Sequence, residues 1–432
     1  MSKPRNISIH VPVLARVEGE GALELDIENE TIKELKLRIF EPPRLFEKFL
    51  EEREPDQVID MVARICGICP VAYQMTAVHA MEALFNVEVT PWIRSMRRVF
   101  YCGEWLQSHA LHIHLLAAPD FLGFNSVTEM AVKYPSEVRR GLRLQTLGND
   151  IIALLGARSV HPIGVCTGGF HHAPDDQQVN SILTRLHKAR NEANELLQWV
   201  ASFKLPDDRQ NFTSVALHND TEYPMNNGRI LSDNGLNIDV NEFNTHFQEK
   251  QIPHSTALYS LLHGKPYLVG PLARINLNIE NLPNDLHDFL RQHHLHFPSQ
   301  NMFHSMIARA IEIRLVIDDA IRLLSDYHYT DTTSVNWTAK AGTAYAATEA
   351  PRGLLWHRYE MNSQGLVEEA QIVPPTSQNQ ARIEEDIKLS LQHIGLDQAE
   401  EVIRLHAEKV IRNYDPCISC ATHFLKLNLK RN

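Results

Sequence analysis

The sequence predicts a mainly helical α+β fold, in which a bundle of long helices carries one antiparallel sheet at the N-terminus. Two periods in the sequence indicate this fold. Residues 7–40 alternate between apolar and polar side chains, as half-buried strands do. From residue 56 onward, apolar residues recur at three- and four-residue steps, the period of an amphipathic helix. No repeat, low-complexity tract or obvious linker divides the chain of 432 residues, so we expect one domain over residues 1–423, mainly β in 1–45 and mainly helical in 46–423.

The individual elements follow in chain order. We expect strands at residues 7–17, 21–27 and 32–40, with "ENET" as the turn between the last two. An acidic first turn and a later glycine frame a helix over residues 55–67. Further helices are predicted at 70–85, from Pro91 to residue 118, and at 176–203, 302–325 and 383–412.

Composition and charge exclude several classes of protein. The chain has 44% hydrophobic and 22% charged residues, an ordinary globular composition. Its net charge of -11 argues against a general affinity for nucleic acid or anionic membranes. No apolar run approaches the roughly 18 residues that span a bilayer, so no transmembrane segment is expected. The N-terminus also lacks the apolar core of a secretory signal, so we expect a cytoplasmic protein with reduced thiols.

The cysteines are unevenly placed. Four of the six form two Cys-x-x-Cys pairs at opposite ends of the chain: Cys66 with Cys69, and Cys417 with Cys420. Structural zinc sites of four cysteines usually have their pairs about 15 to 20 residues apart, so a joint site would have to be assembled by tertiary folding. The spacing favours such a joint metal site and leaves two separate sites or redox dithiols as alternatives. The lone Cys102 and Cys166 are expected to be inert.

Seven motifs, in the same order along the chain, resemble those of the large, catalytic subunit of nickel-iron hydrogenases. The most specific are the cysteine motifs "RICGICP" at Arg64 and "DPCISCATH" at Asp415, with "EAPRGLLWH" at Glu349 between them. The others are "RVEGEG" at Arg16, "RLFEKFL" at Arg44, "SHALHIHLLAAPD" at Ser108 and "QIVPPT" at Gln371. The resemblance covers nearly the whole chain and is closest to the cytoplasmic, NAD(P)-linked sulfhydrogenase or bidirectional branch. It implies the nickel-iron hydrogenase large-subunit fold.

The resemblance also implies a nickel-iron centre that cleaves H2 reversibly and heterolytically to protons and electrons. All four paired cysteines would bind nickel, and Cys69 and Cys420 would also bridge to an iron that carries carbon monoxide and cyanide. Thiolate sulfur is a soft ligand that suits nickel redox chemistry. Cys417 would act as the first base, and Glu18 would relay the proton outward. Taken alone, Glu18 reads as a glutamate on a surface strand.

Three polar residues would surround the iron ligands in a protein of this family. Arg352 would donate to one cyanide, for which a planar and permanently charged guanidinium is suited. Asp415 would orient that arginine, and Thr376 would bond the other cyanide. Without the resemblance, Arg352 and Thr376 read as loop residues, and Asp415 reads as a helix N-cap.

A second metal is implied beside the C-terminus. Glu47, His423 and the backbone carbonyl of Ile372 match a magnesium-like site, where a hard divalent cation would hold the end of the chain. Residues 424–432 continue past His423, where mature chains of this family end. The resemblance therefore implies that nickel chaperones load the site and that a maturation endopeptidase then removes the tail. The plainer interpretation is that the tail stays.

Electron transfer must use other subunits. Cys102 and Cys166 cannot ligate an iron-sulfur cluster by themselves, and the chain has no G-x-G-x-x-G. We expect an iron-sulfur small subunit, with flavin and NAD(P) bound by diaphorase subunits. Two alternatives are a zinc-stabilised scaffold without catalysis and a quinone-module subunit like that of respiratory complex I, a homologue that lacks the cysteine pairs.

Two residues depart from the family pattern. Ser108 stands where the periplasmic branch has an aspartate, and Tyr73 stands where many relatives have a histidine one helical turn after the second cysteine. The sequence leaves open whether His79 takes over that histidine's hydrogen bond to a cysteine sulfur.

Overall fold

The N-terminal sheet consists of β1 (Asn6–Val11), β2 (Gly21–Glu28) and β3 (Thr31–Ile39), which pair antiparallel in that order. They belong to a computed structural model that describes residues 6–423. Positive φ angles of 49° and 58° at Asn29 and Glu30 close the β2–β3 hairpin at the predicted turn. The predicted first strand is too long: it ends at Val11, because Pro12 offers no N–H to extend the pairing. Residues 12–20 form a loop instead.

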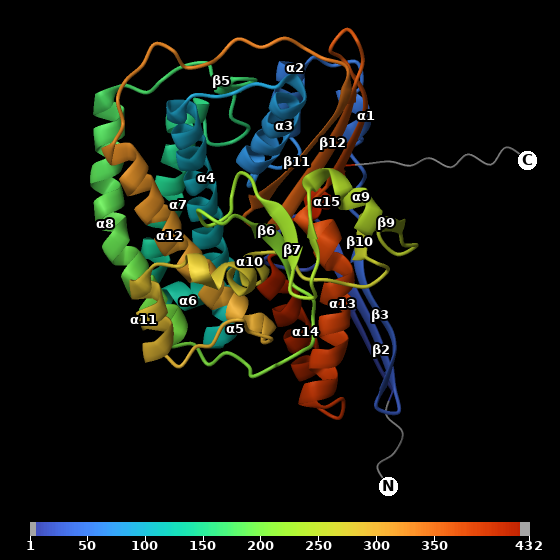
Figure 1. Cartoon of the computed structure of the whole chain (residues 1–432). Helices are drawn as coiled ribbons and strands as arrows, with labels where there is room; N and C mark the ends of the chain where they lie inside the picture. Colours follow the sequence, from blue (N-terminus) through green and yellow to red (C-terminus); the bar gives the residue numbers. More distant parts are fainter. Residues whose placement is uncertain (1–5, 424–432) are drawn as a thin grey trace, which may run out of the picture.

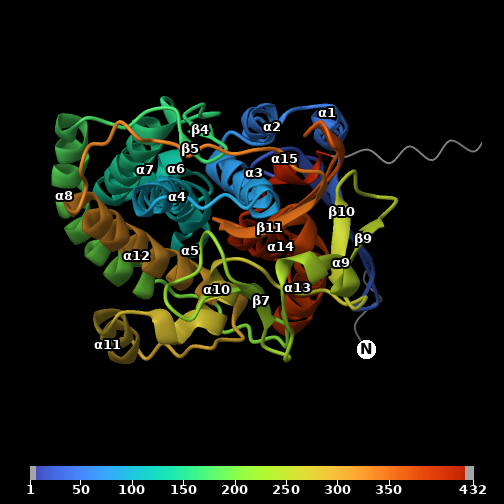
Figure 2. The same cartoon turned by 45° about the horizontal axis from the view of Figure 1, so that its top comes forward.

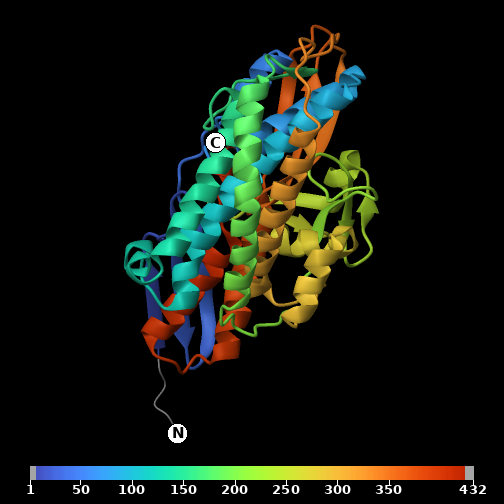
Figure 3. The ribbon, with the colours of Figure 1, turned by 90° about the vertical axis from the view of Figure 1, so that its left-hand side faces the viewer.

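Long helices run side by side and form most of the body (Figures 1 and 3). They are α3 (Pro70–Phe85), α4 (Pro91–Leu111), α7 (Pro135–Gly156), α8 (Asp176–Ala201) and α12 (Ser305–Ser325). Proline in the first turn begins α3, α4 and α7. Helix α7 is missing from the sequence prediction, because Gly141 and Gly148 weaken its helical pattern. Gly148 is required by packing, since a Cβ there would lie 2.5 Å from the backbone nitrogen of Gln107 on α4.

Two predicted helices are interrupted. The helix predicted from Pro91 to residue 118 continues from α4 through a π-helical turn (His112–Ala117) into α5 (Ala118–Leu122). The helix predicted over 383–412 is wrong as a single element. Gly395, with a φ of 92°, ends α13 (Pro375–Ile394), and α14 (Glu400–Tyr414) begins after it.

The shorter helical segments are α1 (Phe46–Leu50), α2 (Pro55–Val62), α6 (Val127–Lys133), α9 (Phe243–His246), α10 (Pro271–Asn278), α11 (Asn284–Gln292), α15 (Ile418–Ala421), and the 3₁₀ turns Val240–Glu242, Ile279–Asn281 and Met302–His304.

A second three-stranded sheet lies within the part predicted to be mainly helical. It comprises β11 (Gly342–Ala350), β12 (Gly353–Met361) and β13 (Val367–Val373), all antiparallel. Most residues of β12 are buried, so the strand shows no alternation that would distinguish it from a buried helix. Smaller pairings, also not predicted, involve β4 (Val165–Cys166), β5 (Gly169–Phe170), β6 (Val215–His218), β7 (Arg229–Ser232), β8 (Asn237–Ile238), β9 (Phe247–Gln251) and β10 (Leu258–Leu262).

The two ends of the chain meet at the centre of this arrangement. Helix α3 packs against β11 and β12, and α15 packs against α13 (Figure 2). One region therefore contains the first residues of α3, the turn between β11 and β12, and α15. No helix within residues 6–423 is both long and apolar enough to cross a membrane.

The contact between α13 and α14 should contribute measurably to stability. Leu391 on α13 is 0% exposed in the cluster that joins the N-terminal sheet to both helices, and Leu389 on the same helix is 37% exposed. We expect Leu391→Ala to destabilise the fold by about 2–5 kcal/mol through lost burial and a residual cavity. The matched control Leu389→Ala should change stability by about 0.5 kcal/mol or less. Thermal unfolding of the two variants measures the difference, and equal midpoints would contradict this packing.

Candidate metal centre

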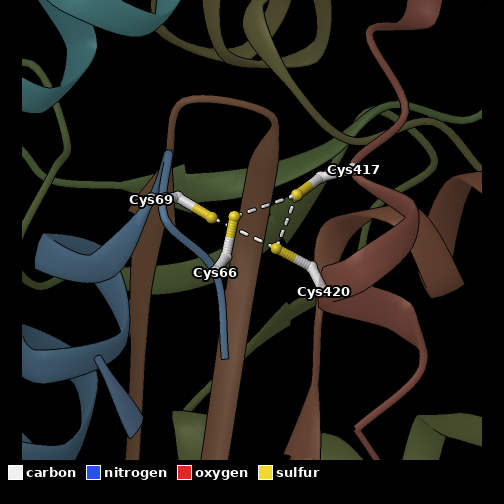
Figure 4. Close-up of side chains that lie close together, drawn as sticks. All are labelled: Cys66, Cys69, Cys417 and Cys420. Carbon is white, nitrogen blue, oxygen red and sulfur yellow. Dashed lines mark hydrogen bonds between the residues drawn. The ribbon is translucent and has the colours of Figure 1, made fainter. Parts of the chain in front are cut away.

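Four cysteine sulfurs converge in the interior. The Sγ atoms of Cys66 and Cys417 lie 3.3 Å apart, those of Cys69 and Cys420 3.2 Å, and those of Cys417 and Cys420 2.7 Å (Figure 4). All four Sγ atoms lie within 4.8 Å of one another, and all four residues are buried. Burial raises the pKa of Cys417 and Cys420, whereas hydrogen bonding from Cys417 lowers that of Cys66. A cation bound at this point would favour the thiolate form of all four.

The start of α3 is held by a buried carboxylate. Cys69 occupies the N-cap position of α3, and its side chain makes no capping bond. Glu104 of α4 takes that role: its carboxylate accepts from the backbone N–H groups of Val71 at 2.6 Å and Ala72 at 3.1 Å. Burial raises the pKa of Glu104 well above its usual value. Sequence reasoning missed this residue, although a glutamate in the otherwise apolar stretch "YCGEWL" was a signal.

One arginine joins the two cysteine segments. The Arg44 guanidinium donates to the backbone carbonyl of Ile65, just before Cys66, at 2.6 Å. It also donates to the carbonyl of Ser419, which lies between Cys417 and Cys420. The backbone N–H of Arg44 bonds the Thr422 carbonyl at 2.8 Å. Arg44 therefore ties the ends of the chain together beside the sulfurs, a role that the sequence did not reveal.

The structure brings Arg352 and Asp415 together, as the resemblance implies. Arg352 Nε donates to the Asp415 carbonyl at 2.8 Å, and its Nη2 lies 3.0 Å from Asp415 Oδ1. A third N–H reaches Ser108 Oγ at 3.4 Å. Asp415 is not a helix N-cap: it ends α14 with a left-handed φ of 56°. This bend turns the chain from α14 toward Cys417.

The turn that carries Arg352 rests on a second buried arginine. Arg274 donates to the carbonyls of Ala350 at 2.9 Å and Pro351 at 3.0 Å. Its charge is balanced by Glu312 and Glu349, and its guanidinium stacks 4.2 Å from the Trp105 ring centroid. A fully paired network of this kind fixes the backbone from which Arg352 projects.

Glu18 and Thr376 both contact the segment around Cys417. Thr376 Oγ1 accepts from the Cys417 N–H at 2.9 Å. The Glu18 carbonyl accepts from Ile418 N–H, and its carboxylate accepts from Ser419 N–H, each at 3.1 Å. Burial, and then the charge on Cys66, raise the pKa of Glu18. Glu18 thus lies in a loop against the cysteine segment and not on a surface strand.

Glu47, Ile372 and His423 also meet. His423 Nε2 lies 2.7 Å from the Ile372 carbonyl oxygen and 3.5 Å from Glu47 Oε1. Glu47 Oε1 accepts from the Ile372 N–H at 2.8 Å, and His423 Nδ1 bonds the Cys420 carbonyl at 2.7 Å. The three predicted ligands therefore form one cluster, and it is attached directly to the cysteine segment. The tail, residues 424–432, lies outside the described residues.

Tyr73 is the residue that lies next to the cysteine sulfurs, and His79 lies elsewhere. The Tyr73 side chain is buried; burial, followed by the charge on Cys420, raises its pKa well above the usual value. Its ring lies 5.7 Å from that of His357. His79 is instead surrounded by the charges of Arg97 and Glu82, and burial lowers its pKa to about 4. Cys102 and Cys166 are buried and do not belong to the group of four sulfurs.

Arg44 allows a direct test of how the site is held together. Replacing Arg44 by Met leaves the Ile65 and Ser419 carbonyls without their donor, a loss of about 1–3 kcal/mol for buried groups. We expect the Arg44→Met variant to bind less metal per chain, as measured by elemental analysis after purification. Arg53→Met is the matched control, because Arg53 is exposed and follows α1, whereas Arg44 precedes it. Equal metal content in both variants would refute the joining role of Arg44.

Comparisons with known proteins agree with this geometry. The family model described as nickel-dependent hydrogenase matches residues 44–141 and 259–423. The chain is 30% identical to sulfhydrogenase 1 subunit alpha of Pyrococcus furiosus, over 98% of this chain and 99% of the relative. It is 27% identical to the beta subunit of an NAD-reducing hydrogenase of Cupriavidus necator, over 95% and 94%. The crystal structure of an NAD+-reducing [NiFe]-hydrogenase superposes with a TM-score of 0.86 at 26% identity, covering 96% of this chain and 99% of that one.

A nickel-iron-selenium hydrogenase from Desulfovibrio vulgaris Hildenborough shares the fold with a TM-score of 0.79 at 21% identity, covering 97% of this chain and 100% of that one. The expected α+β fold of the large subunit is thereby confirmed. The named relatives and solved structures each match this chain over nearly the whole length of both partners. The chain belongs to the nickel-dependent hydrogenase family, as a large, catalytic subunit of these oxidoreductases acting on hydrogen.

Proposed function

We propose that this chain binds nickel through Cys66, Cys69, Cys417 and Cys420, with Cys69 and Cys420 also bridging to an iron that carries carbon monoxide and cyanide. Four buried sulfurs within 4.8 Å of one another, next to Arg352 and Glu18, are the observation that carries this proposal. Soft thiolates fit nickel and iron and would not suit a hard cation. When bound, such a centre supplies heterolytic cleavage of H2.

The protein's own residues would then manage the proton. The Cys417 sulfur is the first base in this proposal, and Glu18 receives the proton from it. Two contacts support this pairing, because the carbonyl and the carboxylate of Glu18 both bond N–H groups directly after Cys417. A raised pKa, caused first by burial, suits a carboxylate that must take up and release a proton near neutral pH.

Arg352, Asp415 and Thr376 would hold the diatomic ligands of the iron. Arg352 is 3% exposed and its charge is paired with Asp415, so its remaining N–H groups offer donors in the buried interior. Thr376 lies in the first turn of α13, and its hydroxyl accepts from the Cys417 N–H. Ser108 offers a hydroxyl to Arg352 Nη1, whereas Asp415 offers a carboxylate to its Nη2.

The cluster of Glu47, the Ile372 carbonyl and His423 would hold magnesium or a similar divalent cation. An oxygen-rich set with space for water is typical of such ions. The cation would couple the last described residue to β13 and α1 and so hold α15 in place.

Electrons would pass to an iron-sulfur small subunit and then, through diaphorase subunits, to NAD(P). Two observations support this branch: the similarity to the NAD-reducing relatives and the absence of further metal-ligating cysteine clusters in residues 6–423. We also propose a cytoplasmic location and maturation by nickel chaperones and an endopeptidase.

Infrared spectroscopy and metal analysis of the complex from its native host test the proposal. We expect nickel in the complex, with more iron than nickel because the small subunit carries iron-sulfur clusters, and infrared bands of metal-bound carbon monoxide and cyanide. Zinc without nickel, together with the lack of these bands, would support the scaffold alternative and refute the proposed centre.

Glu18→Gln tests the proton step. The amide keeps the shape of Glu18 and cannot carry a proton, so H2 oxidation should fall by ~10²–10⁴-fold with nickel content unchanged. Glu20→Gln, at an exposed position in the same loop, should retain activity. A fully active Glu18→Gln enzyme would exclude this relay.

The fate of the tail is decided by intact mass. We expect the active protein to end at His423, where the family match also ends. An active enzyme that retains residues 424–432 would contradict cleavage.

A further inference from the structure

The loop that carries Glu18 lies outside the N-terminal sheet, and one isolated parallel bridge joins Glu18 to Cys417. β1 ends at Val11 and β2 begins at Gly21, so the sheet does not determine the path of residues 12–20. Hydrogen bonds hold the loop ends: Leu14 N–H bonds the Gly21 carbonyl, Glu20 bonds Phe40 and Glu41, and Glu18 contacts Ile418 and Ser419. Something else must fix the middle of the loop if Glu18 is to keep its place beside Cys417.

A guanidinium in the middle of the loop makes that attachment. Arg16 has a left-handed φ of 63°, which turns its side chain into the protein. Its Nη1 donates to the Leu116 carbonyl at 2.5 Å, and its Nη2 lies 2.5 Å from Asp120 Oδ1. Leu116 belongs to the π-helical turn between α4 and α5.

Asp120 is at the same time held by the helix that leads to Cys417. Arg412, near the end of α14, binds both oxygens of Asp120, with Nε 2.6 Å from Oδ2 and Nη2 2.9 Å from Oδ1. A third N–H of Arg412 reaches the Ala15 carbonyl in the Glu18 loop at 3.4 Å. The side chains of Asp120 and Arg412 are 8% and 2% exposed, so the pairing is shielded from water.

The Asp120 carboxylate is therefore bonded, through Arg16 and Arg412, to both segments that carry the proposed proton step, those of Glu18 and Cys417. Arg16 comes two residues before Glu18, and Arg412 lies on the helix whose end turns at Asp415 into Cys417. We propose that Asp120, gripped by Arg412, is a positioning residue that holds the Glu18 loop against the cysteine segment through Arg16. The inference rests on the proposed function only for its kinetic consequence, since the attachment itself is independent of catalysis.

Arg16→Gln is the variant that isolates this attachment. It removes the Arg16 contacts with Asp120 and Leu116 and leaves Asp120 bound to Arg412, so the helices stay paired and the long Arg412–Ala15 bond remains. Arg404→Gln is the matched control: Arg404 pairs with Glu408 on the same helix, and Glu408 remains bound to Arg412. Arg16→Lys is the conservative variant, which keeps the charge facing Asp120.

The first readout is hydrogen-deuterium exchange of the Ile418 and Ser419 amides in the purified complex, followed by mass spectrometry. We expect exchange about tenfold faster in Arg16→Gln, because the acceptors on Glu18 are lost more often, and no change in Arg404→Gln. Unchanged exchange in Arg16→Gln would overturn the proposal. This outcome does not depend on hydrogenase activity, so it is distinguishable from failure of the proposed function.

The second readout separates positioning from loss of folded enzyme. In Arg16→Gln, H2 oxidation should slow about tenfold and show a larger solvent isotope effect in D2O, because proton transfer becomes rate-limiting. Arg16→Lys should restore most of the rate and the normal isotope effect. A slower Arg16→Gln enzyme with an unaltered isotope effect would show a purely structural role and refute the inference.

Discussion

The structure depends on bringing four cysteines from opposite ends of the chain into one buried space. Burial raises the pKa of Cys417 and Cys420. Four sulfurs within 4.8 Å of one another would repel each other if all were thiolates without a cation, so surrounding contacts must hold them in place. A bound cation would reverse this balance and couple metal loading to closure of the C-terminal segment.

Charged side chains that bond to backbone carbonyls and amides provide these contacts. Glu104 holds the first turn of α3, Arg44 joins the Ile65 and Ser419 carbonyls, and Arg274 holds the turn before Arg352. Each of these groups is buried or half-buried and bonded to main chain on a different element. Charge-assisted bonds to backbone are stronger than neutral ones, and they fix the position of a loop without depending on a neighbouring side chain. The site is thus held by its surroundings before any metal is considered.

The fold class was predicted from the sequence and is confirmed, whereas several individual elements were not predicted. The structure brings together the paired cysteines, Arg352 with Asp415, and Glu47 with His423, and their roles stay a prediction. Arg44, Glu104 and Arg274 were missed, since their partners are backbone carbonyls and amides far away in sequence. β12 was missed because a strand buried on both faces has no alternation, and the split between α13 and α14 depends on one glycine.

The central claim is that the four cysteines form one nickel site. X-ray absorption at the nickel edge of the purified complex tests it most directly, because it reports the atoms around nickel regardless of activity. The account predicts a first shell of four sulfur atoms with iron as the next heavy neighbour, and a loss of sulfur scattering when Cys66 or Cys420 is replaced by serine. A first shell of nitrogen and oxygen, with no change in those variants, would contradict it.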